Sequence, residues 1–347
     1  MTENPLVAPR GIRDPSRITP EQPRRSVRRT TSMDILRPDG PQGVLRLRGA
    51  ARDLGIRSDG SPVQFNVSQV DVEIDFAQGW TVTEVESSPS VPALQELRGS
   101  RASSGFRRSM KKTLPEGDSG SLLHRLLDDV PVAAVISGYA LMQEVSPALL
   151  LELSGTGGKG RQDSRTDYCA GYVSGGTMMT GVVRDGVPPR LSGPKAPELV
   201  RHSSSGAWHF MEALPMRSMR RLRRIDVSGE DELLVDAMFR DSYVDASGLE
   251  TVVHEYHVDL RVRADSLEIE KLEVTPHVLP WTECPGAIAG AQRLVGRTVR
   301  EIDAAVGGEF HGISSCTHLN DLLRSIADVE QLSRHLKTIE TSERECH

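Results

Sequence analysis

The sequence predicts an α+β protein made of two homologous copies of an antiparallel sheet with helices on one face, which form a pseudo-dimer within one chain. In each half, segments that alternate apolar and polar residues are followed by segments whose apolar residues recur at helical spacing. Segments of the first half then recur in the same order in the second half. A length of 347 residues is sufficient for two domains of ordinary size.

The first copy is predicted to span residues 27–138. Alternation of apolar and polar residues predicts its strands, and apolar stripes predict its helices. The expected strands are 30–35, 44–48, 70–74 and 80–85, and the expected helices are 92–98 and 121–129. We expect this copy to be structural, because it has no cysteine at the position that corresponds to Cys316.

The second copy is predicted to span residues 219–335 and to carry the functional site. The matched segments are 28–35 with 220–227, 52–53 with 240–241, 70–74 with 258–262, 83–89 with 270–276, and 122–130 with the helix after Cys316. The second copy also contains the segment 279–285, which the first copy lacks. An unequal duplication of this kind predicts that the site evolved in one copy only.

Three further segments complete the predicted organisation. Residues 1–26 are rich in Pro and Arg and lack periodicity, so we expect a disordered arm, and we expect a disordered tail at 336–347. Residues 139–218 are rich in Gly, Ser and Pro but contain Cys169, Trp208 and His209, which favours a covering insertion over a plain linker. Its glycine-rich segment 155–160 lacks the ending of a phosphate-binding loop.

Composition limits the function classes. A net charge of −6 argues against a general nucleic-acid binder, and no apolar run reaches the length of a membrane span. The N-terminus has no apolar segment typical of a secretory signal, and four cysteines without paired spacing favour a reducing, cytoplasmic setting. The predicted partner is a small-molecule substrate, without nucleic acid or membrane. Association of the pseudo-dimer into a homo-oligomer stays open.

The candidate site lies at two predicted helix starts, Cys284 before Pro285 and Cys316 before a leucine-rich stripe. The free N–H groups and the dipole of a helix N-terminus favour an anion, so we expect both cysteines to favour the thiolate. His318 follows two residues after Cys316, and His254 lies on a predicted strand. Cys284, Cys316, His318 and His254 together offer the donors that Zn or iron prefers, and they form the predicted metal site.

Three interpretations of this site stay open. The cysteines could be buried apolar residues, ligands of a metal or an iron–sulfur cluster, or one of them could be a nucleophile with a histidine as base. The predicted catalytic residues are Cys316, His318, Glu283 and Asp321. The arginine-rich run 217–224 fits either a solvated edge strand or an anion site. The predicted anion-binding residues are Arg220, Arg221 and Arg240.

The second half resembles the bacterial family of domain of unknown function 2889. Four segments carry this resemblance: Arg240-Asp241, His254-Glu-Tyr256, Leu279-Pro-Trp-Thr-Glu-Cys-Pro285 and Cys316-Thr-His-Leu-Asn-Asp-Leu-Leu-Arg324. A more distant similarity is to iron–sulfur scaffold proteins of the NifU type, carried by Glu283-Cys-Pro-Gly-Ala-Ile-Ala-Gly290 and Ser315-Cys-Thr-His-Leu319. This second similarity implies antiparallel strands followed by two helix starts that share one pocket.

The resulting prediction is a cytoplasmic enzyme of small-molecule catabolism, of the hydrolase or lyase type, with a Cys/His site that binds Zn, Fe or an Fe–S cluster. The alternative is a non-catalytic iron–sulfur or sulfur-handling protein.

Overall fold

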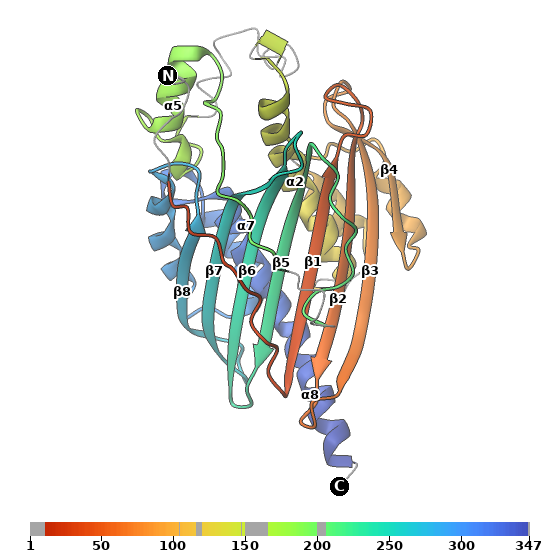
Figure 1. Ribbon diagram of the computed structural model, residues 1–347. Helices are drawn as coiled ribbons and strands as arrows, with labels where there is room; N and C mark the ends of the chain where they lie inside the picture. The colour runs from red at the N-terminus through yellow and green to blue at the C-terminus, as the bar shows by residue number, and fades with distance from the viewer. Residues whose placement is uncertain are drawn as a thin grey trace.

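The computed structural model describes residues 11–103, 105–115, 120–146, 148–149, 166–199 and 206–345. One antiparallel sheet of eight strands forms its centre, in the order β4-β3-β2-β1-β5-β6-β7-β8 (Figure 1). The strands are β1 Ser26–Leu36, β2 Leu45–Ile56, β3 Pro62–Asp75, β4 Thr81–Ser88, β5 Ser218–Ser228, β6 Glu232–Val244, β7 Glu250–Arg263 and β8 Ile269–Val278. The predicted class, α+β with antiparallel strands, is therefore confirmed.

The helical elements follow the strands in each half, as the periodicity predicts. The 3₁₀ helices are η1 Pro92–Leu97, η2 Ala170–Tyr172, η3 Cys284–Leu294, η4 Val299–Glu301, η5 Gly312–Ser314 and η6 Ile326–Asp328. The α-helices are α1 Phe106–Thr113, α2 Leu122–Glu144, α5 Thr177–Asp185, α6 Ile302–Glu309, α7 Thr317–Ser325 and α8 Val329–Glu345. The tail predicted to be disordered from residue 336 is thus helical through Glu345, because Leu336 and Ile339 are buried in the core.

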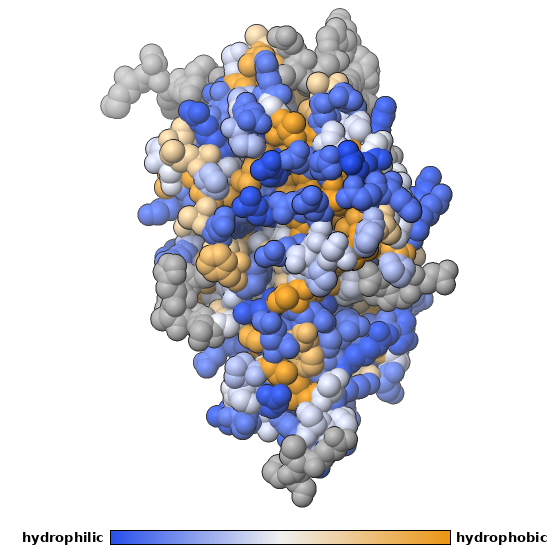
Figure 2. Space-filling model, turned by 90° about the vertical axis from the view of Figure 1, so that its right-hand side faces the viewer, coloured by the Kyte–Doolittle hydropathy of each residue, from blue (hydrophilic) through white to orange (hydrophobic). Residues whose placement is uncertain are grey.

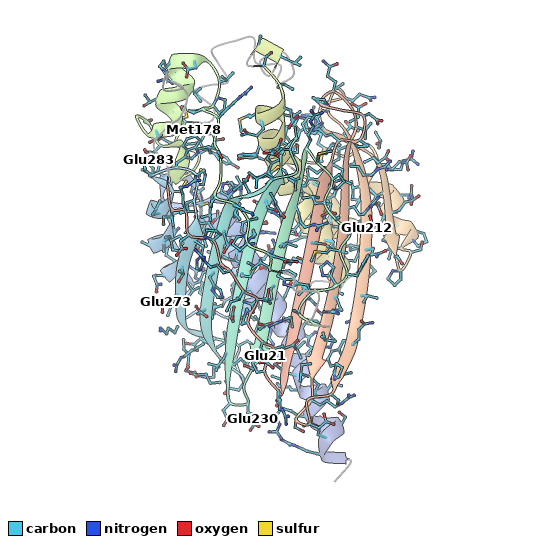
Figure 3. The ribbon with its side chains drawn as sticks, in the orientation of Figure 1. Glu21, Met178, Glu212, Glu230, Glu273 and Glu283 are labelled. Carbon is cyan, nitrogen blue, oxygen red and sulfur yellow. The ribbon has the colours of Figure 1, made fainter. Side chains whose placement is uncertain are left out.

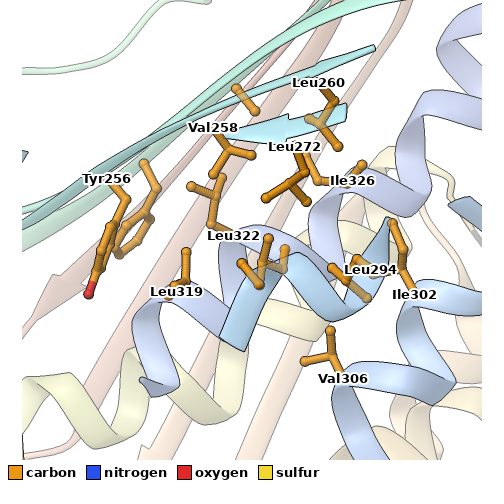
Figure 4. Packing of buried hydrophobic residues seen from close by; sticks show 14 of the residues in the cluster. Tyr256, Val258, Leu260, Leu272, Leu294, Ile302, Val306, Leu319, Leu322 and Ile326 are labelled. Atoms are coloured by element: carbon orange, nitrogen blue, oxygen red, sulfur yellow. The ribbon is translucent and has the colours of Figure 1, made fainter. Parts of the chain in front are cut away.

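Helices α2, α7 and α8 cover one face of the sheet (Figure 1). Alternation along the strands directs one set of apolar side chains to this face. In Figure 4, Leu322 of α7 and Ile326 of η6 lie near Leu260 of β7 and Leu272 of β8, and all four belong to one buried cluster. A second buried cluster joins the strands of the first half to α1 and α2. The core therefore consists of two clusters along one continuous sheet, and each cluster includes at least one residue from the strands of the other half.

Irregular segments cross the opposite face of the sheet (Figure 1). The Gly11 N–H donates to the Pro280 carbonyl at 3.2 Å, and the Asp14 N–H donates to the His277 carbonyl at 2.8 Å. The indole of Trp208, from the long insertion, donates to Thr19 Oγ1 at 2.8 Å. Residues 11–25 are therefore ordered, unlike the arm predicted for 1–26, because the sheet offers partners to their polar groups. Residues 1–10 and the segment 155–160 lie outside the described residues.

The central strands of the sheet carry buried ion pairs. Strand β5, which holds most of the arginine-rich run, pairs with both β1 and β6 and is central, so the interpretation as a solvated edge strand is wrong. Arg221 and Arg223 are each 1% exposed and donate to Asp321 Oδ2 at 2.5 and 3.0 Å. Asp129 of α2 accepts two further bonds from Arg223, at 2.9 and 3.0 Å. Buried arginines paired with helix carboxylates thus connect the sheet to its helices.

The outer surface carries no extended apolar area on the side shown in Figure 2, where hydrophobic patches are separated by hydrophilic residues. Among the helices of the described residues, none has both the length and the apolar character needed to cross a lipid bilayer.

Candidate functional site

The site begins with three cross-strand partners on neighbouring strands. Arg221 of β5 lies opposite Asp241 of β6, and Asp241 lies opposite His254 of β7. Residues in direct cross-strand register point to the same face of a sheet, so these three side chains meet. A β-bulge follows Asp241, and bulges re-aim side chains locally. Asp241 is fully buried and His254 is 7% exposed.

His318, in the first turn of α7, completes this group from the helix layer. Its ring stacks on the His254 ring with centroids 3.6 Å apart and an angle of 18°. His254 Nδ1 lies 3.5 Å and His318 Nε2 lies 3.9 Å from Asp241 Oδ2. The ligand atoms of all three residues lie within 4.8 Å of one another. We refer to Asp241, His254 and His318 as the DHH site.

The protonation states of the DHH site suit a metal ligand set. Burial raises the pKa of Asp241, but the nearby Arg221 and His254 lower it by more, so the net pKa of Asp241 lies below the ordinary value. Burial, and then the proximity of His254, lower the pKa of His318 well below its ordinary value. The site therefore offers a carboxylate and a neutral imidazole near pH 7. His318 keeps 20% of its side chain exposed, which leaves one approach to the site.

Cys316 lies beside the second ring nitrogen of His318: its Sγ is 3.9 Å from His318 Nδ1, whereas Nε2 is the nitrogen nearer Asp241. It occupies the N-cap of α7 without a side-chain cap bond. The expectation that the helix N-termini favour the thiolate is wrong. Burial raises the pKa of Cys316, and burial followed by the nearby Cys316 raises the pKa of Cys284 well above its ordinary value. Loss of solvation outweighs the helix N-terminus at both positions.

The predicted ligand set is only partly brought together. His254 and His318 meet, with Cys316 beside them, but within the described residues Cys284 is not part of the group around Asp241. Asp241 was not among the predicted ligands. The Arg-Asp pair that recurs in both halves could have indicated this ligand, since a buried carboxylate beside a histidine-bearing strand is a common metal ligand.

The two carboxylates predicted to be catalytic, Glu283 and Asp321, are engaged in contacts within the chain. Glu283 Oε1 accepts from both the N–H and the hydroxyl of Thr177 at 2.8 Å, and it fixes the start of α5. Figure 3 shows Glu283 at the same end of the molecule as Met178 of α5. Asp321 is bound by Arg221 and Arg223 and lies one ion pair away from Asp241.

The predicted anion-binding arginines already pair with carboxylates of this chain. Arg220 donates to Asp34 at 2.6 Å, Arg221 to Asp241 at 3.0 Å, and Arg240 to Glu255 at 2.6 Å. Each guanidinium thus has an internal anion as its partner.

A second group of ligand atoms consists of Asp236, His257 and Asp259. His257 Nε2 lies 2.5 Å from Asp236 Oδ1, and Arg224 donates to the same oxygen at 2.5 Å. Because these partners already satisfy Asp236, the DHH site is the better candidate.

No curated protein matches the chain. Residues 219–331, which contain β5 to β8, the DHH site and Cys316, match the model of the family described as Protein of unknown function (DUF2889).

Proposed function

We propose that the protein is a metal-dependent enzyme of the hydrolase or lyase type that acts on small molecules, with the DHH site as its metal centre. One observation carries this proposal: the buried imidazole of His254 and the partly exposed imidazole of His318 stack and converge on one buried carboxylate, and His254 Nδ1 has no hydrogen-bond partner among the described residues. Buried polar atoms are rarely left without a partner. A Zn²⁺ or Fe²⁺ ion is the ligand that two histidines and one carboxylate fit best.

The residues around this centre have separable roles. Asp241 supplies the negative charge, and Arg221, which donates to its Oδ1 at 3.0 Å, fixes its orientation. His318 would hold a metal ion through Nε2, which would leave its Nδ1 protonated and facing Cys316 Sγ. A divalent ion held here would lower the pKa of a bound water and polarise a substrate carbonyl. We further propose that the enzyme acts in the cytoplasm.

We also propose that the two halves are homologous copies related by a pseudo-twofold axis between β1 and β5. Arg28 donates to Asp226 and Arg220 donates to Asp34, both at 2.6 Å, as a twofold exchange of the two strands requires. Arg29 lies opposite Asp53 as Arg221 lies opposite Asp241.

The β-bulges give independent support for this relationship. One follows Asp53 in the first half and one follows Asp241 in the second. Another pair lies at Glu73/Ile74 and at Arg261/Val262, in the third strand of each half. Because bulges are conserved within families, their matched positions favour duplication over coincidence.

Metal analysis of the purified protein tests the proposed function. We expect about one equivalent of zinc or iron per chain, and hydrolase or lyase activity, in a screen of small substrates, that a chelator removes and the metal restores. A protein that binds neither ion would refute the proposal. Brown protein with iron and acid-labile sulfide would instead support the alternative, a non-catalytic iron–sulfur or sulfur-handling protein.

A further inference from the structure

A cavity of about 510 Å³ lies on the face of the sheet opposite the helices, between strands β5 to β8 and residues 20–23 of the segment that crosses them. Alternation along β7 buries Val258 and Val262 on the helical face and directs Asp259 and Arg261 to the cavity. Glu21 and Glu273, which also line the cavity, lie in the lower half of the sheet in Figure 3. Sites for small molecules measure roughly 300–1,000 Å³, so this cavity is large enough for one.

Direct cross-strand register places a row of carboxylates in this cavity. Asp226 of β5 lies opposite Asp236 of β6. Asp259 of β7 lies opposite Asp236 on one side and opposite Glu273 of β8 on the other. All four residues line the cavity. Like charges that face each other across neighbouring strands repel, so this row needs positive partners.

The cations of the chain compensate this row unequally. Asp226 and Asp236 both pair with Arg224, and Asp236 also pairs with His257. The carboxylate of Asp259 has neither an ion pair nor a hydrogen bond within the described part of the chain. Burial, which His257 offsets only in part, keeps the net pKa of Asp259 above its ordinary value. Asp259 is therefore the carboxylate of the row that lacks a positive partner.

Cationic side chains lie two residues further along the same strands. Arg261 of β7 lies opposite Lys271 of β8, and both line the cavity. Arg261 pairs with Glu232 at 3.4 Å, and Lys271 pairs with Glu273 at 3.3 Å. Pairs between exposed side chains of this kind are weak, so both cations can exchange partners. Two residues of a strand span roughly 7 Å, which is the separation expected between the carboxylate row and the cationic pair.

An apolar surface completes the lining. Leu234 lies opposite Arg261 and is 49% exposed, and Pro20 and Pro23 of the crossing segment also line the cavity. A metal ion would use only the carboxylates and would leave Leu234 and Arg261 without a role. A ligand that carries both charges and an apolar middle uses all three features.

We propose that this cavity binds a small zwitterion of the ω-amino acid class, in which an unbranched apolar chain separates an ammonium group from a carboxylate. The ammonium group donates hydrogen bonds to Asp259, and Arg261 and Lys271 donate to the ligand carboxylate. The chain of the ligand packs on Leu234. The cavity and the DHH site lie on opposite faces of the sheet, so this binding does not depend on the proposed function.

Calorimetric titration of the full chain with 5-aminopentanoate tests the proposal. Pentylamine and pentanoate are the matched probes that each carry one of its charged groups. Each should bind at least about tenfold more weakly, because it leaves one set of charged side chains without a partner. Asp259→Asn and Arg261→Gln should each weaken binding of 5-aminopentanoate at least about fivefold. The control, Glu270→Gln, changes an exposed partner of Arg263 outside the cavity lining and should bind as the wild type does.

Each result decides for or against the zwitterion. No binding of 5-aminopentanoate to the wild type, or equal binding by the wild type and both variants, overturns the proposal. Equal affinities of the wild type for 5-aminopentanoate and pentylamine would assign the cavity to simple amines and also overturn it. This comparison of probes needs no variant, so it decides the question even if a variant fails to fold.

Two further measurements separate the cavity from the DHH site. His254→Phe should bind 5-aminopentanoate as the wild type does. Loss of this binding would assign the probe to the DHH site, which overturns the zwitterion site while leaving the proposed function intact. Zn²⁺ binding to His254→Phe that an added Asp259→Asn removes would assign a metal ion to the cavity and overturn the proposal.

Discussion

His254 stacks on His318 with ring centroids 3.6 Å apart, and both rings face one oxygen of Asp241. Two imidazolium rings so close together would repel each other strongly. Burial and the proximity of His254 lower the pKa of His318, which favours the neutral ring that binds a metal ion.

Replacement of His254 by phenylalanine should separate ligation from packing. A phenyl ring preserves the stack on His318 but offers no lone pair, so zinc or iron affinity should fall at least about tenfold while the thermal midpoint changes little. The measurement is metal content after dialysis together with a thermal melt. His124→Phe, on helix α2 of the first half, is the control and should retain the metal. Equal metal content in both variants would contradict the DHH site.

The buried pair of Arg29 and Asp53 should contribute strongly to stability. Arg29 donates to both oxygens of Asp53, at 2.8 and 2.7 Å, and both residues are at most 1% exposed. Asp53→Asn leaves a buried guanidinium short of an anion, so we expect a loss of about 3–5 kcal/mol in the free energy of unfolding by urea. Glu73→Gln, which breaks a half-exposed pair with Arg46, should cost less than about 1 kcal/mol. Equal losses of unfolding free energy in the two variants would show that burial of an ion pair does not determine its contribution to stability.

His209 should make the protein less stable in acid. Burial, and then Arg52 and Arg220, lower the pKa of His209 to about 3, and its ring nitrogens bond to Thr30 and Ser32. The unfolded chain takes up this proton near its ordinary pKa of about 6.5, whereas the folded protein does not. The stabilising contribution is therefore complete above the unfolded pKa and is lost as the pH falls toward 3.

Comparison of the wild type with His209→Gln measures this effect. The difference in unfolding free energy between the two proteins should decrease by about 2 kcal/mol between about pH 7 and about pH 5. His257→Gln is the control with the opposite sign. Burial lowers the pKa of His257, but Asp236 raises it more, so its contribution is present at low pH and is lost as the pH rises through the raised pKa. A parallel pH profile for wild type and His209→Gln would exclude this role of His209.

Glu283 should hold helix α5 against the second half. Its carboxylate accepts two bonds from Thr177 at the first turn of α5, each at 2.8 Å. Glu283→Ala should therefore accelerate amide hydrogen exchange in residues 177–185 relative to the rest of the chain. Glu270→Ala, which removes an exposed partner of Arg263, should leave this exchange unchanged. Unaltered exchange in the Glu283 variant would show that apolar packing of Met178 and Met179 is sufficient.

The sequence by itself determined the local elements. Alternation located all four strands of the first half, and apolar spacing located α2 and α7. Cys284 and Cys316 do lie at helix starts, because Pro285 and the following stripe are local signals. The resemblance of the second half to its family also depended on residues close together in the chain, and the match over residues 219–331 confirms it.

Tertiary structure alone decided which residues meet. Strand β5 is central because β1 pairs with it, and no local pattern in an arginine-rich segment specifies that partner. Asp241 joins His254 through cross-strand register and His318 through the packing of α7, so the DHH site depends on contacts that are remote in sequence. Gly171 lies against Cys284 only because the insertion packs on η3. Propensity acts over a few neighbouring residues, whereas burial and ion pairing act across the whole fold, and these two effects assembled the site.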